Sequence, residues 1–454
     1  MLKYFFMAFI ISSTAIAKDY GRDQLQNLSW GGVDVLWLKD DRFPTYSISV
    51  YFADGALGDG KVKGSTSAAL GLIKSGTRRY GQKEISDTLD FFAANLDTSV
   101  NHEYSRLEIS GLVKDIVPTM KKVCHLMQDS VYPKSELKKE LDSLHASLAN
   151  VETDHRSLAD LVFREVSLKG VPFSYPVTGR MKDHKFLNSN VLKKRLEQLN
   201  SEVKKRIYIT GPSEILNIDK IINEECGWSS KATFVRNVDY KSQKTTKGPS
   251  IFLVPVKKAN QAQVRIGRFL NKDELIPGDE RHALLGEFLA GGFTSILMDE
   301  LRTKRGLVYG VGAFSAAQRD YGRAVITTAT RAEKVVELIN VVKDSLQKLS
   351  LKEVDQQRFE LAKSGLAGSY PFRFEQSEHY LFQLLFLDHL GLSYDELYKS
   401  ADKIRGYKLD DLSQLANQVF EWDNLTILVL GEASLKKELE KLGKVTILNY
   451  KEYL

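Results

Sequence analysis

The chain repeats one pattern of strands and helices, and this repeat constrains its fold more than any other feature of the sequence. An alternating apolar–polar segment begins at Tyr46, and another begins 217 positions later at Gln263. The same offset separates Tyr104 from Tyr321, each of which begins an alternating segment followed by a helical pattern. Since a repeat of this length is the size of a domain, the sequence predicts two homologous lobes.

Each half ends on a similar unit, in which an apolar strand reaches a glycine and a polar helix follows. These strands span 205–211 and 425–431. A Lys/Ser/Thr-rich stretch without periodicity, 239–250, reads as the connection between lobes at 18–238 and 251–454. Strands mixed with long amphipathic helices predict an α+β fold, with each lobe a mostly antiparallel sheet packed with helices on one face.

Composition agrees with this division and excludes one class of function. A chain of 454 residues exceeds the usual size of one hydrophobic core. The 64 basic and 58 acidic residues give a formal charge of only +6, and both signs are interspersed. Nucleic-acid binders carry a basic stripe or patch, which this sequence lacks. We therefore expect no nucleic-acid partner.

The first 17 residues are typical of a secretory signal peptide. Lys3 is followed by an apolar stretch at 4–11 and by Ala15-Ile16-Ala17, an Ala-x-Ala cleavage site. An uncleaved anchor is the alternative. No later stretch reaches the length that a membrane span needs. We expect an exported protein, periplasmic if the source is bacterial, with no membrane span in the mature chain.

The two cysteines leave their state open. Cys124 and Cys226 are the only cysteines in the chain. Export permits a disulfide, but pairing depends on geometry that the sequence does not give. A disulfide and two buried free thiols are equally compatible with the sequence.

One 14-residue frame connects the chain to a known family. It runs from Gly64 to Thr77 and follows a strand that ends at Asp54-Gly55. The frame resembles the zinc-binding helix of the pitrilysin/insulinase peptidases, Gly-x-x-His-x-x-Glu-His-x-x-x-x-Gly-Thr, in length and in both glycines. In that family the histidines bind zinc from one helix face, and the glutamate is the general base on the metal-bound water.

The chain lacks every residue that this chemistry needs. Ser67 and Gly71 stand at the histidine positions, and Leu70 stands at the position of the base. The third ligand of the family falls at or near Leu148. No two of the eight histidines are three or four positions apart. The resemblance therefore implies no metal site in this chain and no catalysis by the isolated chain.

A second frame, at 285–311, resembles the C-terminal lobe of the same family. There an arginine and a tyrosine seven positions apart hold the substrate backbone and polarise its carbonyl, and Arg302 and Tyr309 match them. Read without the family, Arg302 is a helix C-terminal charge and Tyr309 a strand aromatic. Family members often have Ser-Arg-Leu where this chain has Ser295-Ile296-Leu297. The Gly291-Gly292 pair predicts either a mobile segment or a tight turn between helices.

The resemblance implies a function shared between two chains. Some members of the family are heterodimers in which one subunit binds zinc through His-x-x-Glu-His and the other supplies the arginine–tyrosine pair. We expect this chain to be the second kind, a non-catalytic subunit that binds an extended peptide substrate beside the partner's zinc. A structural or scaffold subunit, or a stand-alone peptide-binding protein, is the alternative.

Overall fold

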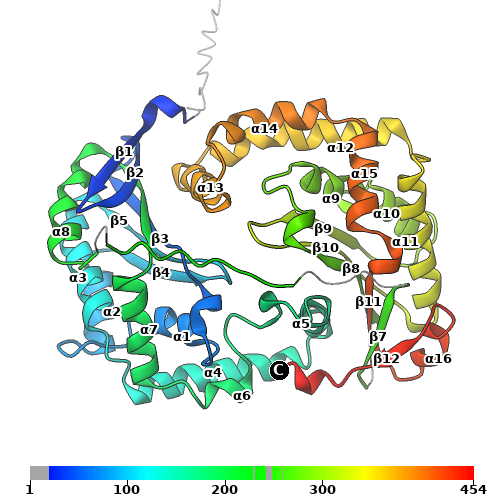
Figure 1. Cartoon of the computed structure of the whole chain (residues 1–454), viewed down its shortest axis with the longest axis horizontal. Coiled ribbons are helices and arrows are strands. Elements are labelled where there is room, and N and C mark those ends of the chain that lie inside the picture. Colours follow the sequence, from blue (N-terminus) through cyan, green and yellow to red (C-terminus); the bar gives the residue numbers. More distant parts are fainter. Residues whose placement is uncertain (1–19, 229–230, 242–247, 258) are drawn as a thin grey trace, which may run out of the picture.

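Two six-stranded sheets face each other across the middle of the molecule, each with its own layer of outer helices (Figure 1). The computed structural model describes residues 20–228, 231–241, 248–257 and 259–454. The predicted signal peptide and much of the predicted connection at 239–250 lie outside these residues. The prediction of an α+β, two-lobed fold is confirmed.

The first sheet has the strand order β1-β2-β6-β3-β5-β4. Only β2 and β6 are parallel, and the other neighbours are antiparallel. Its strands are β1 (Leu25–Trp30), β2 (Val33–Lys39), β3 (Thr45–Phe52), β4 (Asn95–Val100), β5 (Ser105–Leu112) and β6 (Lys205–Gly211).

The second sheet has the order β12-β7-β11-β8-β10-β9, and its last five strands repeat those of the first, whereas its edge strand β12 pairs in parallel where β1 is antiparallel. In both sheets the central antiparallel pair places isoleucines opposite each other, Ile48 with Ile109 and Ile266 with Ile326. Its strands are β7 (Ser250–Pro255), β8 (Ala262–Leu270), β9 (Val311–Ala317), β10 (Gly322–Thr330), β11 (Thr426–Gly431) and β12 (Val445–Ile447).

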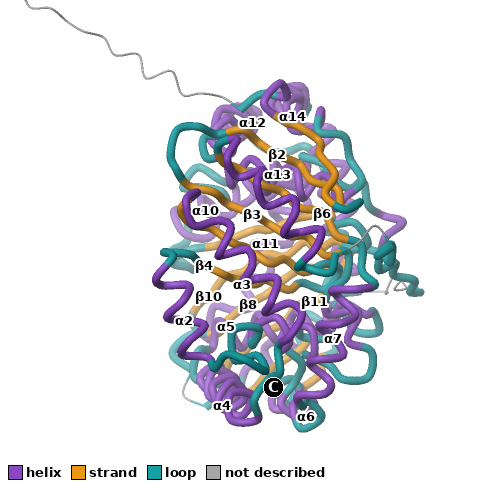
Figure 2. The backbone as a smooth tube through the Cα atoms, turned by 90° about the vertical axis from the view of Figure 1, so that its left-hand side faces the viewer, coloured by secondary structure: helices purple, strands orange, loops and turns teal. Residues whose placement is uncertain are grey.

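Alternation along each strand sends one set of side chains into an outer core and the other set toward the middle of the molecule. In β3 the residues Ile48, Val50 and Phe52 are buried in the first outer core. Its helices are α1 (Ser65–Gly71), α2 (Gln82–Phe91), α3 (Ile116–Asp129), α7 (Ser189–Ser201) and α8 (Asp219–Glu224). Figure 2 views this lobe from its outer side, with its helices in front of the strands.

The second outer core is built in the same way around Ile266, Ile326 and Phe288. Its helices are α9 (Arg281–Ala290), α10 (Ile296–Met298), α11 (Val335–Ser350), α12 (Gln356–Ser369), α15 (Leu409–Val419) and α16 (Leu435–Leu439). Three further helices are α4 (Lys134–Val151), α6 (Met181–His184) and α14 (Asp395–Gly406).

The inner face of each sheet is covered by a helix from the other half of the chain. Helix α5 (His155–Ser167) packs on β8 and β11 of the second sheet, and α13 (Ser377–Leu390) packs on β6 of the first (Figure 1). Phe163 of α5 lies in one apolar cluster with Leu428 and Leu430. Leu36 and Leu38 lie in another with residues of α13. The two halves therefore complete each other's cores.

Ion pairs reinforce this exchange. Asp388 of α13 accepts from Arg206 at 2.6 Å and from the Tyr208 hydroxyl at 2.5 Å, and both donors belong to β6. Glu103 lies 3.5 Å from Arg319 and 3.4 Å from His389, both of which belong to the second half. These polar contacts, together with the apolar clusters described above, hold the two halves against each other.

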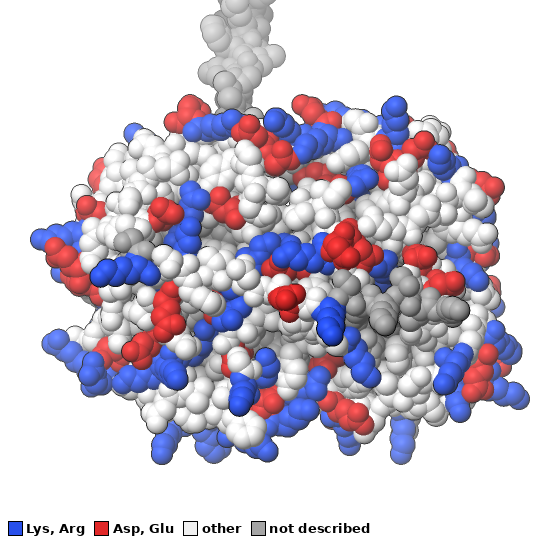
Figure 3. Space-filling model, in the orientation of Figure 1, with Lys and Arg blue, Asp and Glu red and all other residues white. Residues whose placement is uncertain are grey.

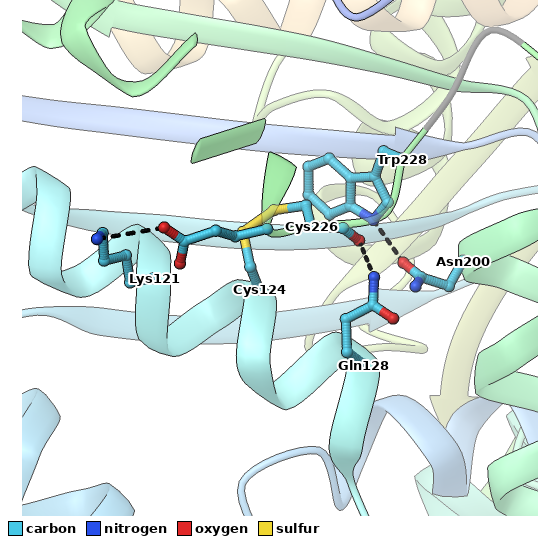
Figure 4. The surroundings of a disulfide bond; sticks show 7 residues. Lys121, Cys124, Gln128, Asn200, Cys226 and Trp228 are labelled. Carbon is cyan, nitrogen blue, oxygen red and sulfur yellow. Dashed lines mark hydrogen bonds and ion pairs between the residues drawn. A yellow bond between two sulfur atoms is a disulfide. The ribbon is translucent and has the colours of Figure 1, made fainter. Parts of the chain in front are cut away.

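Cys124 and Cys226 form a disulfide, which settles the question that the sequence left open. It joins the middle of α3 to the segment after α8, with the two Cα atoms 4.3 Å apart (Figure 4). Gln128 donates to the carbonyl of Cys226 at 2.6 Å, and Trp228 donates to Asn200 at 2.5 Å. The segment that leaves α8 is thereby held against the first lobe.

The surface carries both signs of charge. On the face drawn in Figure 3, basic and acidic side chains alternate without a continuous basic stripe. Within the described ranges, every helix is too short or too polar to cross a membrane.

Candidate functional site

Helix α1 lies within the 14-residue frame that resembles a zinc-binding helix. A buried carboxylate positions the first turn of this helix. Gly64, which precedes α1, has a φ of 83°, a conformation that favours glycine. Asp59 accepts from the backbone N–H of Gly64 and of Thr66, each at 2.8 Å, and from the Ser65 hydroxyl at 3.0 Å. Burial raises the pKa of Asp59 against these bonds. The carboxylate satisfies donors that the first turn of a helix leaves free.

A second carboxylate fixes the loop that enters α1. Asp54 is almost completely buried and accepts from Arg195 of α7 at 2.9 Å and from Arg236 at 2.9 Å. Arg195 also donates to the Thr66 hydroxyl at 2.7 Å. Buried ion pairs therefore hold the residues around α1 in place.

The four positions that correspond to zinc ligands and base hold no metal-binding group. Leu70 is fully buried in the first core, Ser67 and Leu148 are half-buried, and Gly71 is exposed. A Cβ at Gly71 would meet no atom within 4 Å. Across 20–228, 231–241, 248–257 and 259–454, no three His, Cys, Asp or Glu side chains group closely enough to hold a metal ion.

His145, near the position of the family's third zinc ligand, forms a contact with another histidine. His145 of α4 lies 2.9 Å from His184, nitrogen to nitrogen, and the two rings are stacked. The other ring nitrogen of His184 lies 3.0 Å from the Thr178 carbonyl. Because a carbonyl only accepts, His184 donates there and accepts from His145. This pair braces α4 against α6.

Arg302 and Tyr309 lie together at the surface of the second lobe. Arg302 is half-buried in a π-helical turn, Asp299–Thr303, and Tyr309 is 84% exposed in the segment that leads into β9. The guanidinium carbon lies 5.0 Å from the centroid of the Tyr309 ring and 5.2 Å from that of Phe293. The cation is thus held between two aromatic faces.

The neighbours of Arg302 have structural partners that Arg302 does not share. Lys304 and Arg305 both pair with Glu300, and Arg358 pairs with Asp299 at 3.1 Å. No ion pair among the described residues includes Arg302. Its guanidinium is therefore available to a ligand.

The structure explains two sequence features near Arg302, the isoleucine at 296 and the Gly291-Gly292 pair. Ile296 is buried in the second core, so this position contributes to packing. After the glycine pair, the Ser295 hydroxyl donates to the Gly292 carbonyl at 2.6 Å. This bond makes the segment a tight turn, which presents Phe293 to solvent with 73% of its surface exposed.

An open sheet edge and a cavity adjoin Tyr309. Strand β9 pairs only with β10, so its other backbone edge has no neighbouring strand among the residues that the structure describes. A cavity of about 670 Å³ lies elsewhere, between α4, α6 and α7, whereas one of about 560 Å³ is lined by Tyr309, Thr327 and Arg156. The second of these brings a residue of α5, from the first half, to the site.

Sequence reasoning found Arg302 and Tyr309 but missed Phe293 and Arg156. Phe293 stands between a glycine pair and Thr294-Ser295, so its exposure depends on how this turn is placed. Arg156 precedes the site by about 150 positions, and only the exchange of α5 between the halves brings it near. The single available signal was the turn-forming glycine pair, which makes exposure of the next residue plausible.

The chain is similar to proteins of one peptidase family. Residues 199–366 match a family model described as "Peptidase M16 inactive domain". A "Non-peptidase homolog YmxG" of Helicobacter pylori is 21% identical over 91% of this chain and 95% of its own length. An "Uncharacterized zinc protease YmxG" of Bacillus subtilis is 20% identical over 88% of this chain and 96% of its own.

Solved structures agree. A peptidase M16 inactive domain from Pseudomonas fluorescens superposes with a TM-score of 0.78 and 18% identity, covering 90% of this chain and 98% of that one. The periplasmic protease PqqL of Escherichia coli superposes with a TM-score of 0.72 and 12% identity, over 90% of this chain and 46% of PqqL. At these identities the likeness establishes the fold.

Proposed function

We propose that the chain is a non-catalytic member of the M16 peptidase family and the substrate-binding subunit of a heterodimeric zinc peptidase that acts on peptides. The zinc and the general base come from a homologous partner with an intact His-x-x-Glu-His helix. This chain contributes Arg302 and Tyr309, and the peptide lies between the two subunits. When bound in the partner, zinc activates water for attack on the peptide carbonyl.

The observation that carries the proposal is the guanidinium of Arg302, which lies between the rings of Phe293 and Tyr309 and forms no ion pair among the described residues. A guanidinium offers a fixed fork of donors that suits a backbone carbonyl. The Tyr309 phenol donates to an oxygen that becomes negative when water attacks, as oxyanion-hole donors do. The aromatic faces keep the arginine extended without neutralising it, so its charge stays available for substrate.

The open edge of β9 supplies the second part of the site. An extended peptide adds to such an edge through backbone hydrogen bonds, and alternate side chains then enter neighbouring pockets. The cavity beside Tyr309 lies next to this edge and is lined by residues of β8, β9 and β10. Binding through backbone atoms favours unfolded or short peptides over folded proteins.

The proposed location is outside the cytoplasm. A disulfide between Cys124 and Cys226 persists in oxidising compartments and is rare in the cytosol. One structural relative, PqqL, is described as a periplasmic protease. Both observations support export, with the periplasm as destination in a bacterial cell.

The test is peptidase activity of the mature chain, alone and mixed with its nearest His-x-x-Glu-His homologue, with zinc content measured in each sample. We expect the isolated chain to be inert and zinc-free, and the mixture to cleave peptides. Arg302→Ala should lower kcat/KM of the mixture by about 100-fold, as loss of one oxyanion-hole donor does. Arg305→Ala, which removes a paired arginine three positions away, is the matched control and should leave activity nearly unchanged.

The alternatives give different results in the same assay. A scaffold subunit would tolerate Arg302→Ala together with Tyr309→Phe, with full activity in the mixture. A stand-alone peptide-binding protein would bind peptide without any partner and gain no activity on mixing. Stoichiometric zinc in the isolated chain, together with cleavage, would contradict the loss of the metal site.

A further inference from the structure

Strand β9 ends two different rows of residues at the open edge of the second sheet. Cross-strand partners in an antiparallel sheet stand next to each other and point to the same face. In one row, Arg265 of β8 pairs with Thr327 of β10, which pairs with Gly312 of β9. In the next row, Val325 of β10 pairs with Phe314 of β9. A peptide strand that adds to β9 would extend each row by one residue.

Both rows lie on the inner face of the sheet. Val325 belongs to the apolar cluster that contains Phe163 of α5, and residues two positions apart on a strand share a face. Gly312 and Phe314 are therefore on the face toward α5, which packs against this sheet (Figure 1). Val311, between these positions and Gly310, points the other way and is buried in the second outer core.

The row that ends at Gly312 leaves a free place beside a cavity. Gly312 and Thr327 both line the cavity of about 560 Å³ described above. A Cβ at position 312 would lie 3.1 Å from Oγ1 of Thr327, so a side chain there would occupy this place. Neighbouring strands are only about 4.8 Å apart. The side chain of a peptide residue opposite Gly312 can therefore pass over the glycine and enter the cavity.

The cavity carries one positive charge that forms no ion pair with the protein. Among the described residues, its lining includes two arginines and no aspartate or glutamate. Arg265 is paired with Asp160. Arg156 is exposed, and no ion pair within the described ranges includes it. Asp154, two positions before Arg156, is the N-cap of α5 and accepts from the first turn of that helix. A carboxylate in the cavity would thus supply Arg156 with a partner.

The row that ends at Phe314 is apolar. Phe314 is 53% exposed, whereas its neighbour Val325 is buried beneath α5. The phenylalanine ring therefore offers an apolar surface at the open edge of β9. An apolar or aromatic side chain in the next place of this row would cover the ring, as cross-strand pairs do in sheets. Successive places on one face of a strand are about 7 Å apart.

We propose that β9 selects extended peptides in which a Glu or Asp side chain enters the cavity toward Arg156 and an apolar or aromatic residue two positions away packs on Phe314. The spacing of two follows from the strand, because the residue between them points to the other face. The acidic residue comes first or second according to the direction of the peptide along β9. This inference rests on the proposed peptide-binding function and assigns the substrate class of its site.

The test is a binding series on the full mature chain with fluorescein-labelled eight-residue peptides. The first set carries Glu or Gln at each position in turn. The second set keeps Glu at its best position and carries Phe or Ser at each of the others. Anisotropy gives Kd for each peptide. We expect Glu to bind about 5-fold more tightly than Gln at one position, and Phe about 5-fold more tightly than Ser two positions from it.

Variants assign each preference to its residue. Arg156→Gln should reduce the ratio for Glu over Gln to about 1 and keep the Phe preference, and Phe314→Ala should do the opposite. Arg156→Glu should favour Lys over Gln at the same position, because it reverses the charge at the cavity. Arg405→Gln, at an exposed arginine of α14, and Phe186→Ala, at a phenylalanine that is 52% exposed, are the matched controls and should change neither preference.

Thermal unfolding separates selection of peptides from a role in folding. Both substituted side chains are exposed, so Tm of each variant should stay within about 2 °C of the wild type. If Arg156→Gln lowers Tm further, Arg156→Glu must still favour Lys, or the proposal is wrong. Equal Kd for Glu and Gln at every position, a Glu preference that survives in Arg156→Gln, or a Phe preference at another spacing would each overturn it.

Failure of the broader proposal looks different. If the chain binds peptides with these preferences but its mixture with the zinc-bearing homologue cleaves none of them, the selection by β9 stands and the shared peptidase is wrong. If the mixture cleaves peptides in a way that depends on Arg302 but shows no Glu or Phe preference, the proposed function stands and the selection by β9 is wrong.

Discussion

At the scale of single residues, buried ion pairs hold the loop that enters α1. Asp54 lies between Arg195 and Arg236 and accepts a hydrogen bond from each. Asp54→Ala would leave Arg195, with 5% of its side chain exposed, without its partner. We expect a loss of about 3–5 kcal/mol in the free energy of unfolding, measured by urea denaturation. Asp41→Ala, in an exposed pair with Lys39, should cost under about 1 kcal/mol, and an equal loss in both variants would contradict this account.

His102 gives the fold a defined acid sensitivity. Its pKa falls from 6.5 in the unfolded chain to about 4 in the fold, through burial and then through Arg164. The folded state therefore favours the neutral ring. This contribution is complete above pH 6.5 and is lost as pH falls toward 4. When pH falls from 6.5 to 4, the free energy of unfolding should decrease in both proteins. We expect the decrease to be about 2–3 kcal/mol smaller in His102→Gln than in the wild type. An unchanged pH dependence in urea titrations would show that His102 titrates normally.

At the scale of single residues, the sequence predicted which residues belong to the candidate site better than it predicted their neighbours in the fold. It named Ser67, Leu70 and Gly71 as unable to bind zinc, which stays a prediction; in the fold Leu70 is buried, Ser67 is half-buried and Gly71 is exposed. It named Arg302 and Tyr309, which lie within 5.0 Å, but whether they hold substrate stays a prediction. It could not find Phe293, because whether a phenylalanine is buried or exposed depends on packing, and packing is not local to the sequence.

Among the elements, the disulfide has the most direct energetic consequence. It closes a loop of 102 residues between α3 and the segment after α8. A cross-link over such a loop removes much of the unfolded chain's entropy, which stabilises the fold by about 2–5 kcal/mol. Replacing Cys124 and Cys226 by serine should lower the free energy of unfolding by that amount. Dithiothreitol should lower the free energy of unfolding of the wild type by the same amount and should not change that of the double variant. A wild type whose stability does not change with dithiothreitol would contradict this prediction.

Strand and helix patterns predicted the elements but not where two of them pack. The alternation at Tyr46 and Tyr104 became β3 and β5, and their counterparts 217 positions later became β8 and β10. The periodicity of α5 and α13 shows an apolar face but not which sheet that face covers. Each helix crosses to the other half, so local reasoning from the sequence could not predict that Arg156 lies at the candidate site.

For the whole molecule, this exchange of helices sets how the repeat unfolds. Two lobes of similar fold and separate outer cores could melt in two steps. Here the inner face of each sheet is sealed by the other half, through α5 on one side and α13 on the other (Figure 1). Unfolding one lobe would expose the inner face of its neighbour. The free energy of each half therefore depends on the other, and we expect a single cooperative transition.

Phe163→Ala tests this coupling. Phe163 of α5 is 2% exposed and packs in the cluster with Leu428 and Leu430 of the second sheet. Truncation should cost about 3–5 kcal/mol. If the halves are coupled, calorimetry will show one transition at a lower Tm, with van't Hoff and calorimetric enthalpies still equal. Leu361→Ala, at an exposed position of α12, should leave Tm nearly unchanged. A separate early transition in Phe163→Ala would show that the second lobe melts on its own.

The same coupling bears on the proposed function. Tyr309 of the second half and Arg156 of α5, from the first half, line one cavity, so the position of one relative to the other depends on the contact between the halves. A fixed relative position is the condition under which a partner's metal site and the donors of this chain can act on the same peptide.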